Sequence, residues 1–247
     1  MKQKKRVNMT TAFYVAALSL SFFSEMTMAN MSVYPMELNV DRSGAAQIKV
    51  ASKTDDIQFI RVRQKKILNP GTAEEKEIDV ASWKEGGVVV TPEKFALAAG
   101  AMRVVRLVSL TPPEKETTWR VYFEGVKQPD SIILGKAETP AAMATLGVNV
   151  IWGALIHLAP EKSVVSLSID PRRGTLKNNG TLRVPLREIG ICDANSSCKW
   201  IKEDATIYPD TERKLKTLTK TQGQKYKFRY FNWINKTAEE ADLPVVQ

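Results

Sequence analysis

The 247-residue sequence has few of the residues from which most enzyme and metal sites are built. It contains one histidine, His157, and two cysteines, Cys192 and Cys198. A serine nucleophile needs a histidine and a carboxylate placed beside it, and no GxSxG elbow is present. Zinc-ligand spacing, a DxDxDG-like calcium loop and a phosphate-binding glycine motif are also missing. We therefore predict no enzyme, no cofactor and no metal site, and a structural, hydrogen-bonded role for His157.

Long apolar runs are missing as well, apart from a short one near the N-terminus. The basic cluster MKQKKR is followed by an apolar run from about Ala12 to Phe23, with small residues at Thr27 and Ala29. This run is shorter than the roughly 20 residues that a membrane-spanning helix needs. It indicates a signal peptide over residues 1–29, and hence an exported chain without membrane insertion.

Positive charge exceeds negative charge only moderately. The formal net charge is +9, and removal of residues 1–29 takes away four cations and one anion, which leaves +6. No RNP-like, zinc-finger or helix-turn-helix signature accompanies this excess. We therefore predict acidic partners and no binding of nucleic acid.

The two cysteines lie close together, in the stretch CDANSSC. An even pair in an exported chain predicts one disulfide, Cys192–Cys198. Because the closed loop is short, the bond contributes about 2 kcal/mol in the chain-entropy model. The spacing is not that of a CxxC exchange motif, so we interpret the bond as the staple of a hairpin loop.

The rest of the chain consists of short alternating segments separated by polar turns such as NPGT, EGG and KQPD. This pattern predicts antiparallel β-sandwiches. The alternation stops at Pro160 and starts again at about Ser163, which predicts one domain over residues 30–160 and a smaller one over 161–247.

One alternating segment, residues 145–160, is longer than an ordinary strand of about 5–6 residues. One of its faces is apolar throughout and too long for one small sheet to cover: Leu146, Val148, Val150, Trp152, Ala154, Ile156 and Leu158. A flat apolar edge is normally blunted by charge, and no charge interrupts this one. We therefore expect another molecule to cover its first half.

Several segments resemble the periplasmic pilus chaperones in order and spacing. VTPEKFALAAGAMRVVRLVSL (90–110) resembles a TP…L.PG….VRL segment, and GVNVIWGALIHLAP (147–160) resembles the long strand that closes the first domain. TTWRVYFEGV (117–126) and GTLKNNGTLRVPLREIGIC (174–192) resemble the strand before it and the start of the second domain. The matching positions of the first segment are Thr91, Pro92, Leu97, Gly100, Val105, Arg106 and Leu107. WRVYFEGV and the cysteine pair are closer to the alternate branch, which serves colonisation-factor fimbriae of enteric bacteria.

This resemblance implies two immunoglobulin-like domains in an L shape and a chaperone that works in the periplasm without ATP. Its partners would be fimbrial subunits, which it folds and caps, and an outer-membrane usher that receives them. Each subunit lacks its last strand, and the chaperone donates one by β-strand addition. The resemblance leaves open whether the free protein caps itself as an oligomer.

The residues that fill the subunit groove would be Leu146, Val148, Val150 and Trp152. Each fully buried apolar side chain contributes about 1.5–3 kcal/mol, so four supply a large part of the binding free energy. We assign Ile156 and Leu158 instead to the core of the chaperone itself, because the strand must also anchor its own sheet.

The sequence departs from the family in one respect. Better-known members hold the terminal carboxylate of the subunit with an arginine on the first strand and a lysine on the long strand. Here those strands have the sequences YPMELNV (34–40) and WGALIHL (152–158), without either residue. We nominate Arg120 first and Arg106 second as the carboxylate anchor, against ordinary roles in surface ion pairs, with His157 as a weaker candidate.

Two other classes of function remain as alternatives. A fimbrial structural subunit or adhesin would share the sandwich fold, but it would be one incomplete domain with its donor segment at the mature N-terminus. A secreted enzyme would need an assembled site, which the sequence lacks.

Overall fold

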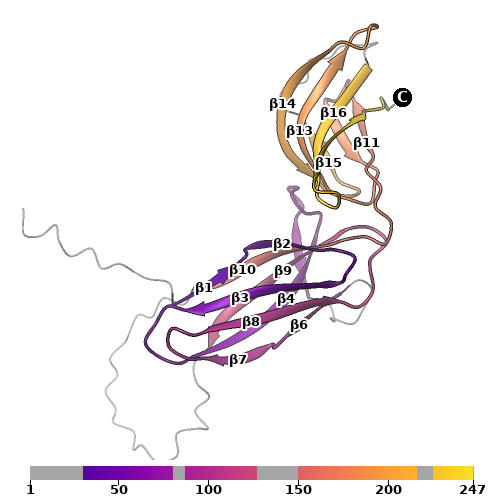
Figure 1. Ribbon diagram of the computed structural model, residues 1–247. Helices are drawn as coiled ribbons and strands as arrows, with labels where there is room; N and C mark the ends of the chain where they lie inside the picture. Colours follow the sequence, from indigo (N-terminus) through magenta and orange to yellow (C-terminus); the bar gives the residue numbers. More distant parts are fainter. Residues whose placement is uncertain (1–29, 80–86, 127–149, 216–224, 247) are drawn as a thin grey trace, which may run out of the picture.

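The computed structural model describes residues 30–79, 87–126, 150–215 and 225–246, and every regular element in these ranges is a β-strand. Figure 1 shows two bodies that lie at an angle, joined by one crossing of the chain. The all-β prediction with two immunoglobulin-like sandwiches is confirmed. No helix in the described ranges has the length and apolarity required to cross a membrane.

The first sandwich packs a four-stranded sheet on a six-stranded one. The four-stranded sheet has the order β1-β3-β8-β6, and the other has the order β2-β10-β9-β4-β5, with β7 pairing to β4. The strands are β1 (Met31–Tyr34), β2 (Glu37–Val40), β3 (Ala45–Ser52), β4 (Gln58–Leu68), β5 (Lys76–Ile78), β6 (Val88–Thr91), β7 (Lys94–Leu97), β8 (Met102–Ser109), β9 (Thr117–Val126) and β10 (Ile151–Leu158).

The second sandwich is smaller. Its sheets have the orders β11-β12-β15 and β14-β13-β16-β17. The strands are β11 (Leu167–Asp170), β12 (Thr175–Asn178), β13 (Val184–Cys192), β14 (Cys198–Ile207), β15 (Glu212–Lys214), β16 (Lys225–Asn232) and β17 (Thr237–Asp242).

Alternation along the strands builds the two cores. In β9, Trp119, Val121 and Phe123 are fully buried, while Arg120 and Tyr122 between them point to the other face of the sheet. The inward residues of both sheets form one apolar cluster in the first sandwich, and a separate cluster around Phe228 fills the second. The period of two in the sequence is therefore the physical cause of each two-layer core.

The Asn-rich turn after β12 shows why its glycine is needed. The buried amide of Asn178 donates to the carbonyls of Leu182 and Ile207, and its oxygen accepts from the backbone N–H of Gly180. A Cβ on Gly180 would lie 2.3 Å from the carbonyl oxygen of Val164. This turn ties the start of the second sandwich to the segment that leads into it.

Candidate functional site

The strand β10 has an incomplete set of backbone partners. On one side it pairs with β9 along its whole length, from Ile151 to Leu158. On the other side β2 pairs only with Leu155–Leu158, in parallel. Within the described ranges, the backbone groups of residues 151–154 therefore face no strand on that side. Unpaired N–H and C=O groups in a row form a template for another strand.

A second free edge begins at the same place. Among the described residues, strand β1 pairs only with β3. The chain then passes from the four-stranded sheet to the six-stranded one at Pro35 and Met36. The carbonyl of Met36 accepts a hydrogen bond of 2.7 Å from the N–H of Leu155, the first residue of β10 that β2 covers. Figure 1 shows β1 and β10 next to each other. The open part of β10 thus lies where the edges of the two sheets separate.

The apolar face of β10 changes from buried to exposed along the strand. Ala154, Ile156 and Leu158 are buried in the core, and Trp152 is half-buried against it. Val150, just before the strand, is 37% exposed. The assignment of Ile156 and Leu158 to the core agrees with these positions. Leu146 and Val148 lie outside the described residues.

The indole Nε1–H of Trp152 is buried and has no hydrogen-bond partner among the described residues. A buried donor without a partner costs free energy. Trp152 therefore differs from the other inward residues of β10, which have no polar atom to satisfy.

On its outward face β10 presents Gly153, Leu155 and His157. The register places Leu155 between Glu37 of β2 and Arg120 of β9. Arg120 is thus next to the long strand on the outward face of the six-stranded sheet. In the sequence Arg120 stands as a charge inside an apolar strand; the structure shows that it points away from the core and already has a partner.

The partner of Arg120 is Glu77 of β5. Arg120 Nη1 lies 2.5 Å from Glu77 Oε1, and the hydroxyl of Tyr122 lies 2.8 and 2.7 Å from the two oxygens of the same carboxylate. Glu75 Oε1 is 3.6 Å from Arg120 Nη2. Partial burial lowers the pKa of Arg120, but the hydrogen bond with Tyr122 and the charge of Glu77 outweigh this and raise it.

The second nominated arginine lies elsewhere. Arg106 of β8 is exposed on the outer face of the four-stranded sheet, between Gln47 of β3 and Thr91 of β6. It forms no ion pair with any residue in the described ranges. The structure therefore does not bring Arg106 and Arg120 together.

A buried polar cluster joins the two sandwiches, and the sequence did not reveal it. The carboxylate of Glu116, just before β9, pairs with the guanidinium of Arg183 and accepts from the backbone N–H of Arg183 at 2.9 Å. The indole N–H of Trp233 donates to it at 3.2 Å, and Arg183 Nη2 donates to Asn39 Oδ1 at 2.6 Å. No sequence signal marks these residues, because 67 positions separate Glu116 from Arg183.

His157 lies in this cluster with no exposed surface. Its Nδ1 is 3.3 Å from Thr118 Oγ1 and 3.5 Å from Glu116 Oε1. Its Nε2 is 3.3 Å from Glu37 Oε1, in a contact that does not meet hydrogen-bond geometry. Burial lowers the pKa of His157. The neighbouring imidazole lowers the pKa of Glu37.

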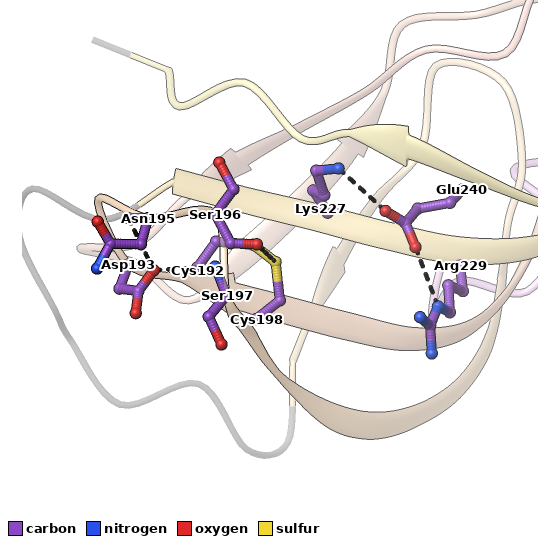
Figure 2. Close-up of a disulfide and its surroundings, with 9 residues drawn as sticks. All are labelled: Cys192, Asp193, Asn195, Ser196, Ser197, Cys198, Lys227, Arg229 and Glu240. Carbon is purple, nitrogen blue, oxygen red and sulfur yellow. Dashed lines mark hydrogen bonds and ion pairs between the residues drawn. A yellow bond between two sulfur atoms is a disulfide. The ribbon is translucent and has the colours of Figure 1, made fainter.

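The predicted disulfide is present, far from these sites. Cys192 at the end of β13 is bonded to Cys198 at the start of β14. Figure 2 shows how the loop between them is tied: the carboxylate of Asp193 accepts from the backbone N–H of Asn195 and of Ser197, each at 2.9 Å. The bond therefore staples a hairpin loop, as the sequence predicts.

Within the described ranges, no group of three or more histidine, cysteine or acidic side chains is arranged to hold a metal ion.

No protein-family model matches the chain. It is 36% identical over 207 residues to an Escherichia coli protein named as a CFA/I fimbrial subunit, covering 80% of this chain and 84% of that protein. It is 32% identical to the solved structure of "Class 5 Fimbriae Chaperone CfaA", with a TM-score of 0.71 over 87% of this chain and 99% of that one. It is also 32% identical to a chain in a solved "chaperone-tip adhesin complex" of CFA/I fimbriae biogenesis. For that chain the TM-score is 0.70, over 87% of this chain and 99% of the other.

Proposed function

Because the chain belongs to the family of class 5 fimbrial chaperones, we propose that it holds a fimbrial subunit on the open edge of β10 and delivers it to an outer-membrane usher. The observation that carries this proposal is the unpaired backbone of residues 151–154, next to the exposed Val150. A strand of the subunit would complete the hydrogen bonds of this edge.

Side chains would add affinity to this backbone pairing. Val150, Trp152 and the preceding Leu146 and Val148 would enter the core of the subunit in alternation. Trp152 would bridge the two proteins, since it already packs against the core of the chaperone and its indole N–H lacks a partner among the described residues. The transfer of apolar surface from water is the driving force, and it needs no nucleotide.

The periplasm is the compartment that we propose. Residues 1–29 have the features of a secretory signal peptide, and the Cys192–Cys198 bond is of a kind that persists in oxidising compartments. One relative belongs to a complex of a chaperone with a tip adhesin, which supports a fimbrial subunit as the ligand.

The alternative function, that of a structural subunit, is supported only by the names of relatives. A subunit that awaits a donated strand is one incomplete domain. This chain has two sandwiches, each with its own apolar core, and its free edge is in the middle of the sequence. We therefore propose that the chain is the donor and not the recipient of the strand.

The test is a charge at the predicted contact. Val150→Arg should abolish co-purification of a fimbrial subunit from the periplasm, because the charge would be buried without a partner in the subunit core. The melting temperature should stay unchanged, because Val150 is exposed in the free protein. Ile151→Arg is the matched control, since Ile151 is 47% exposed on the opposite face of the strand. Normal capture by Val150→Arg would refute the assignment of the donor strand.

A further inference from the structure

The side chains of Arg120 and Tyr122 already bind one carboxylate of the same chain, that of Glu77. Arg120 Nη1 and the Tyr122 hydroxyl converge on Glu77 at 2.5–2.8 Å. A guanidinium with a second donor beside it is a strong and directional arrangement for binding a carboxylate.

The local backbone leaves room for this arrangement next to β10. A Cβ on Gly153 would lie 3.1 Å from Cδ of Arg120 and 3.2 Å from Cε1 of Tyr122. Both side chains therefore lie against the backbone of the long strand, where any side chain at position 153 would crowd them. The carboxylate site and the open edge of β10 are thus parts of one surface.

Glu77 is held less firmly than the two residues that bind it. Its strand, β5, has three residues and lies at the end of the sheet order, and among the described strands it pairs with β4 only. Arg120 and Tyr122 belong instead to β9, which has ten residues and is paired on both sides. An acid on a short edge strand can leave such a site without disturbing its donors.

We propose that Glu77 is an internal substitute for a ligand carboxylate: it fills the Arg120–Tyr122 site in the free chaperone and is displaced by the carboxylate of a bound subunit. This inference rests on the proposed function, because the ligand is brought to the site by the strand that pairs with β10. Beyond that function, it states that Glu77 competes with any incoming carboxylate and so keeps free carboxylates out of the site.

Because both groups are negatively charged, Glu77 and a ligand carboxylate cannot occupy the Arg120–Tyr122 site together. Glu77 occupies both donors of the site, Arg120 Nη1 and the Tyr122 hydroxyl. A further carboxylate would lie directly against the negative charge of Glu77 unless Glu77 moved away. A carboxylate attached to a strand on β10 has an effective concentration in the millimolar range, which a free anion lacks in dilute solution.

The first experiment uses acetate as the probe. The side-chain Nε–H resonance of Arg120 is followed by NMR during an acetate titration of the wild type, of Glu77→Gln and of Glu124→Gln. Glu124 is the matched control, because it pairs with Arg61 and Arg63 on the same face of the sheet. Half-saturation should need at least tenfold less acetate in Glu77→Gln than in the other two proteins. Equal titrations, or no shift of Arg120 in any protein, would overturn the proposal.

The second experiment separates this site from the donor strand. A ten-residue peptide of alternating valine and threonine is prepared with a free C-terminal carboxylate and as its amide. Glu77→Gln should bind the free-acid peptide about tenfold more tightly than the wild type does, with no gain for the amide. Equal gains for both peptides would refute the role of Glu77. In that case, loss of subunit capture in Val150→Arg would still support the donor edge, so the two proposals fail separately.

Discussion

Glu116 of the first sandwich and Arg183 of the second form an ion pair from which water is excluded, with side-chain exposures of 0% and 6%. The backbone N–H of Arg183 and the indole of Trp233 complete the set of donors to this carboxylate. Arg183 also lies 4.9 Å from the centre of the Trp233 ring. Three groups of the second sandwich therefore contact the carboxylate of Glu116 in the first. These contacts fix the angle at which the two sandwiches meet.

Removal of Glu116 should destabilise the protein strongly. Glu116→Ala leaves the guanidinium of Arg183 buried without its counter-charge, for which we expect a loss of about 3–5 kcal/mol in the free energy of unfolding. Urea titration measures this loss, and small-angle scattering should detect a change in the angle between the domains. Lys115→Ala is the control, because Lys115 pairs with Asp210 at 2.7 Å in an exposed position. That change should cost less than about 1 kcal/mol. Equal losses in both variants would contradict this account of the interface.

His157 should make the stability of the domain interface depend on pH. Burial lowers the pKa of His157 in the folded protein, so the unfolded chain binds its proton at a higher pH than the folded chain does. The stability that the neutral His157 contributes is therefore fully present above its pKa in the unfolded chain, about 6.5. This contribution is lost as the pH drops below that value. The groups around the imidazole are Glu37, Thr118, Glu116, Arg183 and the ring of Tyr208.

The measurement is the melting temperature between pH 7.5 and pH 5. In His157→Gln the decrease over this range should be smaller than in the wild type, because the titrating group is gone. The lowered pKa of Glu37 adds a further loss of stability only near and below its ordinary value of 4.5. A parallel decrease in both proteins above pH 5 would show that His157 does not cause it.

Loss of the disulfide should reduce stability and leave binding intact. The double variant Cys192→Ala, Cys198→Ala should lose about 2 kcal/mol of stability or less, because the bond closes a loop between residues only six positions apart. Chemical denaturation checks this value. Subunit capture should be normal, since the bond lies in the second sandwich and the open edge of β10 in the first. A variant that folds with normal stability but fails to bind would place the loop at an interface.

Local pattern predicted much of this architecture. The period of two in the segments 117–126 and 151–158 gives β9 and β10. The sequence also marks Arg120 as a charge that needs a partner, but not the face of the sheet on which it lies. The close spacing of the two cysteines gives the hairpin loop. These features depend on neighbours in the sequence, and the local alternation of apolar and polar residues is sufficient to predict them.

Pairs that are distant in the sequence could not be predicted in this way. The partner of Arg120, Glu77, is 43 positions away and is brought close by the order β9-β4-β5. The Glu116–Arg183 pair depends on how two domains meet. No local pattern distinguishes these acids from others on the surface, because their burial results from the tertiary structure alone.

The last prediction concerns the carboxylate anchor. A donated strand can slip by two residues and still present its apolar side chains, so the register needs a separate end point. Arg120 is our first candidate because it lies beside Leu155 on the long strand, whereas Arg106 lies on the other sheet. A charge-assisted bond to the terminal carboxylate of the subunit would supply about 1.5–3 kcal/mol.

Arg120→Ala should therefore weaken the protection of the subunit by tenfold or more, with little change in melting temperature. Limited proteolysis of the complex measures the protection. A subunit shortened at its C-terminus should bind the wild type as poorly as the intact subunit binds Arg120→Ala, and the two changes together should cost no more than either alone. Arg106→Ala is the comparison and should bind normally. If Arg120→Ala captures the subunit like the wild type, or merely unfolds the first sandwich, then Arg120 is structural and other residues hold the carboxylate.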